Sequence, residues 1–264
     1  STTRHFSIVG CDSPLSLDEH WIKVNVQVSD EDASKTQNLA SAIEQYHAWY
    51  EKAPAGHDRA LLDPDTLGLF YRHCVIVGGP GMGKSLLLRR LAREYAKASY
   101  PVVLVNLPAL CARMTQQGST FEESLFALGL DSSGVSLTSK QWRKIRNWIL
   151  ICDGLDECGP DQGLVTDGLS KFIAGNPDCR AIVATRPVGY HRSSLSGWRH
   201  YELLPFEDSA VSGHLATLIS GLMAGREEES KLAIKFARSQ IEQNNAAKIV
   251  GRSPLLLSMI AALA

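Results

Sequence analysis

The run of residues from Gly78 to Ser85 has the types and spacing of a loop that binds phosphate. A polyphosphate is held by backbone N–H groups that approach it closely, and glycine permits this approach because it has no Cβ atom. In this pattern the lysine reaches the β- and γ-phosphates, and the serine hydroxyl ligates Mg²⁺. The sequence therefore predicts a nucleotide site made by this run and the next residue: Gly78, Gly79, Pro80, Gly81, Met82, Gly83, Lys84, Ser85 and Leu86.

The segments on either side of this loop favour the same interpretation. The apolar run 74–77 precedes it, and a leucine-rich helical stretch from Leu86 to Ala98 follows it. A phosphate in the loop would therefore lie at the positive N-terminus of a helix. The competing interpretation is a glycine turn that matches the pattern by chance. The strand and helix around the loop favour the P-loop NTPase class over that alternative.

Three acidic residues follow a second apolar run, 148–152. Asp153 comes directly after this run, where a carboxylate could hold Mg²⁺ at the end of a strand that neighbours the loop's strand. Asp156 and Glu157 come just beyond, and either could orient or deprotonate the water that attacks the γ-phosphate. A solvated turn is the alternative for three acids so close together. Their pairing with the glycine loop favours a metal ligand and two candidate catalytic acids.

An arginine follows a further apolar run, 181–184. Arg186 lies within Thr185-Arg186-Pro187, at the expected carboxyl edge of the sheet, where ligands bind. From this edge its guanidinium could sense the γ-phosphate and stabilise charge during hydrolysis. A structural salt bridge is the competing role.

Short apolar runs with β-branched residues alternate with helical stretches along the middle of the chain. Strands are expected at 74–77, 102–105, 148–152, 181–184 and 200–204. This alternation predicts an α/β fold with a doubly wound parallel sheet. After Pro205 the chain becomes almost wholly helical, at 208–223, 226–243 and from 254 onward, which predicts a C-terminal helical arm.

A short lead-in precedes this core. Residues 21–28 alternate between apolar and polar, which predicts a half-buried strand, and Leu39, Ile43, Tyr46 and Tyr50 recur at helical spacing. The predicted organisation is therefore a lead-in of strand plus helix at 1–52, a P-loop NTPase core at 53–204 and a helical arm at 205–264. Because the chain begins without Met and ends inside an apolar run, we expect it to be part of a longer protein.

The composition limits the remaining function classes. With 27 basic and 28 acidic residues, the net charge of −1 provides no global basic field for nucleic acid. The six cysteines form no CxxC pair, which favours reduced structural thiols in a cytoplasmic protein over disulfides or a zinc site. No apolar stretch is long enough to span a membrane, so we expect no membrane partner.

These motifs, in this order, make the chain resemble the NACHT family of signal-transducing NTPases. The residues that carry the resemblance are the loop at 79–85, Asp153-Gly154-Leu155-Asp156-Glu157, and Thr185-Arg186-Pro187. The second motif discriminates most, because AAA+ ATPases normally place the catalytic acid directly after the Mg²⁺ aspartate. Leu203-Leu204-Pro205-Phe206 and Ser253-Pro254-Leu255 resemble parts of the family's helical arm. The resemblance implies that Pro254 lies near the adenine, although Gly251-Arg252-Ser253-Pro254 departs from the tighter Gly-x-Pro spacing of related proteins.

The resemblance also implies a function. Such proteins bind ATP or ADP with Mg²⁺, are closed with ADP, and open with ATP to form a homo-oligomer that activates a fused effector. Effector and sensor domains would lie in the same full-length protein, with a role in innate immunity or antiphage defence. ATP is preferred over GTP by resemblance, and the chain has no Asn-Lys-x-Asp guanine motif. The alternatives are a nucleotide-locked scaffold with little hydrolysis and a P-loop kinase of a small substrate.

Overall fold

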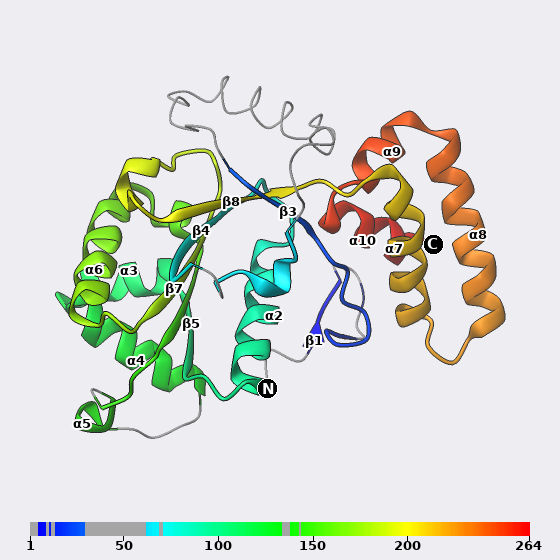
Figure 1. Cartoon of the computed structure of the whole chain (residues 1–264). Helices are drawn as coiled ribbons and strands as arrows, with labels where there is room; N and C mark the ends of the chain where they lie inside the picture. Colours follow the sequence, from blue (N-terminus) through cyan, green and yellow to red (C-terminus); the bar gives the residue numbers. More distant parts are fainter. Residues whose placement is uncertain are drawn as a thin grey trace.

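The protein has an α/β core flanked by a short N-terminal segment and a helical arm (Figure 1). The structure, a computed structural model, describes residues 5–8, 11, 14–29, 62–68, 71–133, 138–142 and 144–264. The helix predicted around Leu39, Ile43, Tyr46 and Tyr50 lies outside these residues.

The core is a six-stranded sheet in the order β3-β8-β4-β7-β6-β5. Its strands are β3 (Asn25–Val28), β4 (His73–Val77), β5 (Val102–Asn106), β6 (Ile149–Asp153), β7 (Arg180–Thr185) and β8 (Arg199–Leu204). The five strands from β4 to β8 are parallel, and β3 pairs antiparallel with β8 at one edge. The predicted α/β fold with a mostly parallel sheet is confirmed. The strand predicted at 21–28 begins only at Asn25.

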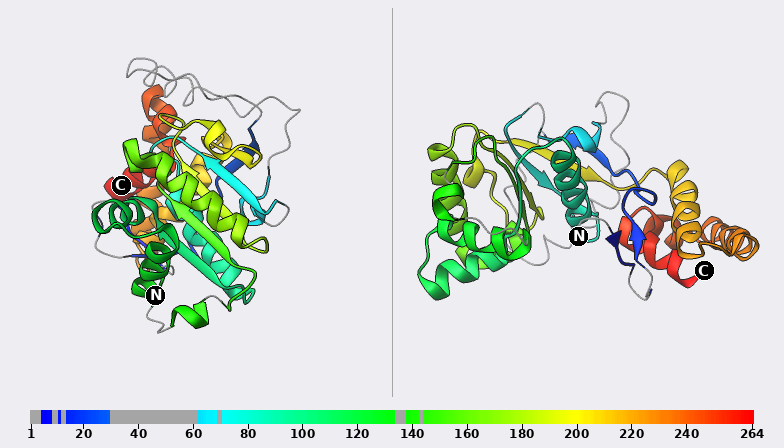
Figure 2. Two further views of the ribbon diagram at one scale, coloured as in Figure 1. Left: turned by 90° about the vertical axis from the view of Figure 1, so that its left-hand side faces the viewer. Right: turned by 90° about the horizontal axis from the view of Figure 1, so that it is seen from below.

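Alternate residues of the strands pack into two separate cores, one on each face of the sheet. Ile76 and Ile182 belong to the face covered by α2 (Lys84–Lys97). Val75 and Val183 belong to the other face. There α3 (Leu107–Gln117), α4 (Phe121–Ser133) and α6 (Gln162–Gly175) cover the sheet, as the side view in Figure 2 shows. Both faces are therefore protected from water, which explains why the central strands are continuous apolar runs.

The order of the strands corrects one detail of the sequence interpretation. Asp153 was expected on a strand next to that of the glycine loop, but β7 lies between β4 and β6. The carboxyl end of β7, with Thr185 and Arg186, therefore lies between the loop and the acidic residues. Sequence order cannot reveal this arrangement, because it depends on which strands pair in three dimensions.

The arm contains four helices: α7 (Asp208–Leu222), α8 (Glu227–Gln243), α9 (Asn245–Gly251) and α10 (Pro254–Leu263). Three were predicted, and α9 was not. Asn244 caps α9, because its side-chain oxygen accepts from the N–H groups of Ala246 and Ala247. Within the described residues no single helix is long and apolar enough to cross a membrane, although α9 and α10 pass that test as a pair bent by 119°.

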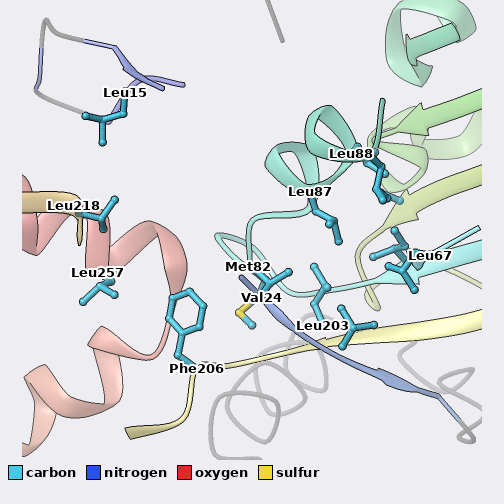
Figure 3. Packing of buried hydrophobic residues seen from close by; sticks show 14 of the residues in the cluster. Leu15, Val24, Leu67, Met82, Leu87, Leu88, Leu203, Phe206, Leu218 and Leu257 are labelled. Carbon is cyan, nitrogen blue, oxygen red and sulfur yellow. The ribbon is translucent and has the colours of Figure 1, made fainter. Parts of the chain in front are cut away.

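The N-terminal segment, residues 5–8, 11 and 14–29, packs against both the core and the arm. It contains a two-stranded hairpin, β1 (His5–Phe6) and β2 (Leu15–Ser16), followed by β3. One apolar cluster joins Leu15 and Val24 of this segment with Met82 of the core and Leu218 and Leu257 of the arm (Figure 3). All five side chains are buried. The segment is therefore integrated into the fold and shares its core.

All six cysteines are free thiols, and all except Cys11 are buried. Burial raises the pKa of the Cys74 and Cys179 thiols to about 12. These thiols stay protonated at neutral pH and act as small apolar side chains.

Candidate nucleotide-binding site

The glycine loop connects β4 to α2 at the centre of the sheet. Its first residue, Gly78, donates its backbone N–H to Thr185 O at 3.1 Å, which fixes the loop to the end of β7. Gly83 is the N-cap of α2 and has no side chain to occupy the helix end. The first N–H groups of α2, together with the helix dipole, therefore form a site for an anion.

The Lys84 side chain lies over this loop, where two backbone carbonyl groups of the loop accept hydrogen bonds from its ammonium. Its Nζ donates to Gly78 O at 2.7 Å and to Gly79 O at 2.9 Å. Burial lowers the pKa of Lys84 to about 8, although the nearby carboxylate of Asp156 opposes this shift. The ammonium is therefore charged at neutral pH and is placed to exchange carbonyl oxygens for phosphate oxygens.

This lowered pKa predicts that nucleotide affinity falls at alkaline pH. Above about pH 8, Lys84 is mostly neutral in the ligand-free protein. Phosphate binds the charged form, so binding at this pH requires Lys84 to take up a proton, which weakens the affinity. We expect the Kd for ADP without Mg²⁺ to rise by up to about tenfold per pH unit between about pH 8 and about pH 9.5. Calorimetric titration across this range measures the slope. The weaker residual binding of Lys84→Met should be independent of pH, and an equal slope in both proteins would assign the effect to another group.

The acidic residues and the arginine form one connected group. Gly154, at φ 83°, lets the chain turn directly after β6 into the short helix η2 (Leu155–Asp161). Asp156 accepts from the backbone N–H of Arg186 at 2.9 Å, and its second oxygen lies 3.1 Å from Arg186 Nε. Arg186 Nη2 lies 3.1 Å from Glu157 Oε1. One guanidinium therefore holds both candidate catalytic acids.

The two acids differ in exposure, which separates their roles. Only 9% of the Asp156 side chain is exposed, whereas 51% of the Glu157 side chain is exposed. Asp156 is held by two atoms of Arg186, its backbone N and its Nε, and Glu157 has a single contact with Arg186. Asp156 is therefore suited to orient Arg186, and Glu157 is free to move toward a water molecule.

Ser85 and Asp153 have the chemistry of Mg²⁺ ligands, and both side chains line one cavity beside the glycine loop. Mg²⁺ binds oxygen, and in nucleotide sites it keeps several waters and uses one or two protein groups besides the phosphates. One hydroxyl and one carboxylate fit this requirement. In the described part of the chain, no group of three or more His, Cys, Asp or Glu side chains forms a metal site of its own.

A cavity of about 530 Å³ extends from the glycine loop to the N-terminal segment and the arm. This volume suits a nucleotide-sized ligand. One end is polar and is lined by Lys84, Ser85, Asp153, Asp156, Glu157 and Arg186. The other end is mostly apolar and is lined by Phe6, Ile8, Trp21, Ile22, Val24, Leu218, Pro254 and Leu255.

The sequence indicated the polar end of this cavity but missed most of the apolar end. Pro80, Gly81, Met82, Gly83, Leu86 and Pro254 line the cavity as expected, whereas Gly78 and Gly79 act from behind it by holding Lys84. Met82 also packs into the shared core. The lining residues missed are those of the N-terminal segment together with Arg89, Gly154, Leu218, Leu255 and Ser258. Trp21 and Ile22 carried a strand pattern, and no signal in them indicated that they line the cavity.

The arm is hydrogen-bonded directly to the glycine loop. Leu255 donates its backbone N–H to Gly81 O at 3.0 Å, and Ser253 Oγ donates to the same oxygen at 3.4 Å. The ring of Pro254 lies beside Gly83, since a Cβ atom added to Gly83 would be 3.7 Å from Pro254 Cβ. The first turn of α10 is therefore in direct contact with the glycine loop, so a movement of either one affects the other.

Because of this contact, we expect Gly81→Ala to lower the free energy of unfolding by more than an alanine at another glycine with positive φ. Gly81 has φ 72°, and an added Cβ would lie 3.0 Å from Leu255 Cβ. Gly225 has φ 83° but no atom within 4 Å of an added Cβ. We expect Gly225→Ala to lower the free energy of unfolding by about 1–2 kcal/mol through backbone strain alone, and Gly81→Ala to lower it further. Urea unfolding without nucleotide measures both, and equal losses would show that the arm does not press on the loop.

A model of the NACHT domain matches residues 72–220, which is more than half of the chain. The chain belongs to the NACHT family. The matched NACHT region contains the P-loop, the three acids and Arg186, and it ends within α7. This assigns the chain as a NACHT P-loop NTPase module that binds nucleotide, whereas Pro254 lies beyond the matched residues.

Three solved structures show a distant likeness to this NACHT chain. Domain III of the replication initiation protein DnaA from Thermotoga maritima is 14% identical with a TM-score of 0.47, covering 84% of this chain and 86% of that one. AMPPCP-bound DnaA from Aquifex aeolicus is 14% identical with a TM-score of 0.42, covering 70% of this chain and 60% of that one. This chain thus spans about three fifths of the Aquifex protein. PCH-2 from C. elegans is 12% identical with a TM-score of 0.40, covering 89% and 70%.

At these identities and TM-scores, the likeness carries no information on what this chain binds. A search of curated proteins gave no match.

Proposed function

We propose that this NACHT module binds ATP and ADP with Mg²⁺, hydrolyses ATP slowly, and uses the bound nucleotide to set the position of its helical arm. The observation that carries this proposal is the pair of hydrogen bonds from Ser253 and Leu255 to Gly81 O. Because the arm contacts the phosphate loop itself, a nucleotide in the cavity touches both parts. Nucleotides that differ in their phosphates then favour different positions of the arm.

The residues around the cavity have distinct roles in this proposal. Lys84 and the N–H groups of the loop bind the phosphates, while Ser85 and Asp153 hold Mg²⁺. The metal, when bound, neutralises charge on the phosphate oxygens. Glu157 accepts a proton from the attacking water, and Asp156 keeps Arg186 oriented toward the reacting phosphate. In the arrangement observed, Arg186 holds Glu157, which is consistent with slow turnover in a resting form.

The output of the switch is proposed from the family. ATP binding releases the arm, and the released form assembles into a homo-oligomer that activates an effector in the same full-length protein. Sensor domains would control this release, and the setting would be cytoplasmic innate immune or antiphage defence. A nucleotide-locked scaffold is the second candidate, and the Arg186 contacts with both acids support it. A P-loop kinase has no specific support in the described residues.

A combined assay tests this proposal. The purified chain is denatured, and any released nucleotide is identified by chromatography. Hydrolysis of ATP is then measured with Mg²⁺ and with EDTA, and particle mass is measured by light scattering with ADP and with ATP. We expect bound adenine nucleotide, slow Mg²⁺-dependent hydrolysis, and a larger particle with ATP. Binding without any hydrolysis would favour the scaffold, and the absence of nucleotide binding would contradict both.

A further inference from the structure

A single carboxylate connects the N-terminal segment to the P-loop helix. Asp18, in the turn after β2, contacts three cations of α2. Its Oδ1 lies 3.4 Å from Arg90 Nη1 and 3.5 Å from Lys97 Nζ, and its Oδ2 is hydrogen-bonded to Arg93 Nη2. Because these cations are spaced by three and four residues, they lie on one face of the helix.

This cluster is more than an ordinary surface ion pair. The Arg90 and Arg93 side chains are only 17% and 18% exposed, and that of Asp18 is 40% exposed. The Asp18 carboxylate is exposed, so salt can screen its contacts, and two mostly buried arginines hold it with directed N–H groups. Removing Asp18 would remove the carboxylate that contacts all three cations, while Arg90 and Lys97 would keep their contacts with Glu94.

The position of Asp18 relative to the cavity gives the cluster a consequence for the ligand. His20, Trp21, Ile22 and Val24 follow Asp18 closely and line the cavity. Other attachments of the described segment include the pairing of β3 with β8, the ion pair of Lys23 with Asp63, and buried apolar side chains such as Leu17. Asp18 therefore fixes one wall of the cavity onto α2. The same helix begins with Lys84 and Ser85 at the phosphate end.

We propose that Asp18 is a positioning residue that keeps the N-terminal segment closed over the nucleotide and thereby sets how long the nucleotide stays bound. This inference rests on the proposed nucleotide binding. Asp18 contacts α2 beyond the phosphate loop, so its release opens the apolar end of the cavity without removing a phosphate contact. Nucleotide exchange then depends on ionic strength through Asp18.

The dissociation rate of a fluorescent ADP analogue, chased with excess ADP, tests the proposal. We expect Asp18→Asn to accelerate dissociation by about five- to tenfold at low salt, since Asp18 is shared by two mostly buried arginines and a lysine. In the wild type, dissociation should accelerate between about 0.05 M and about 0.5 M NaCl, and in Asp18→Asn this salt dependence should largely disappear. The maximal hydrolysis rate with saturating ATP should change less than the dissociation rate.

Glu94 provides a matched control on the same helix. It lies 3.4 Å from Arg90 and 2.9 Å from Lys97, but it belongs to α2 and holds no part of the cavity wall. Glu94→Gln removes the same kind of ion pair and should leave dissociation unchanged. Asp18→Glu, which keeps the charge, should restore most of the slow dissociation. Asp18→Asn should have little further effect in the background of Arg93→Gln, because the shared contact is already weakened.

Hydrogen exchange without nucleotide gives a readout that does not depend on binding. Amides of residues 14–24 should exchange faster in Asp18→Asn than in the wild type, while those of β4 and β7 keep their protection. If Asp18→Asn does not fold, Arg93→Gln replaces it with the same expectations. If nucleotide binds but dissociates at the same rate from the wild type and Asp18→Asn, the role of Asp18 is wrong while the proposed function stands. The same holds if Glu94→Gln accelerates dissociation as much as Asp18→Asn. A wild type that binds no nucleotide overturns the proposed function.

Discussion

Lys84→Ala is expected to weaken the binding of ADP and ATP by about ten- to a hundredfold and to remove measurable hydrolysis. Lys84 Nζ sits on the carbonyls of Gly78 and Gly79, in the curve of the loop where the phosphates would lie. A charged hydrogen bond to phosphate contributes about 1.5–3 kcal/mol, and 1.4 kcal/mol corresponds to a factor of ten in affinity. Calorimetric titration with ADP and Mg²⁺ measures the loss.

The stability of the variant separates a binding defect from misfolding. Burial lowers the pKa of Lys84, so the charged side chain is not favoured by its position in the ligand-free protein. Lys84→Ala should therefore unfold near the wild-type midpoint without nucleotide, and it should lose the stabilisation that ADP gives the wild type. Lys171→Ala, at an exposed site on α6, should behave as the wild type in both respects. Unchanged ADP affinity in Lys84→Ala would contradict the assignment of residues 78–85 as the phosphate-binding loop.

Glu157→Gln is expected to slow ATP hydrolysis by about a hundred- to a thousandfold while leaving the Kd for ADP within about twofold, since it removes a general base and no phosphate contact. Single-turnover hydrolysis of radiolabelled ATP measures this step. Glu157 is the exposed acid, with one contact to Arg186. The amide cannot accept a proton from water, although it can still bind Arg186 as a neutral partner.

Asp156→Asn should give a different pattern. Asp156 accepts from both the backbone and the side chain of Arg186, so the amide loosens Arg186 and lowers stability as well as hydrolysis. Stability loss in Asp156→Asn but not in Glu157→Gln would agree with the two roles. Hydrolysis at the wild-type rate in Glu157→Gln would transfer the role of base to Asp156.

The features predicted correctly from sequence are those coded by local pattern. The strand β4, the loop at 78–85 and the start of α2 form one continuous stretch, so residue spacing is sufficient to identify them. The central strands are apolar on both faces, and their runs are equally visible. Helix α9 escaped prediction because its seven residues are too few to show a helical period, and its start depends on the Asn244 cap.

The features that were missed depend on contacts between distant segments. Nothing near Asp153 shows that β7 lies between its strand and β4, which places Arg186 against Asp156. Strand order follows from pairing across the whole sheet, and a local window contains no information on it. Trp21 and Ile22 line the cavity only because β3 joins the edge of the sheet and carries the preceding residues over the loop.

Photoaffinity labelling with an azido-adenine nucleotide tests most directly whether the nucleotide lies between the P-loop, the N-terminal segment and the arm. The label is activated on the purified chain, and the modified peptides are identified by mass spectrometry. We expect labelling within residues 20–24 or 254–258, competition by excess ATP, and loss of the label in Lys84→Ala. Labelling confined to peptides away from this cavity, or labelling that survives both excess ATP and Lys84→Ala, would contradict this position of the nucleotide.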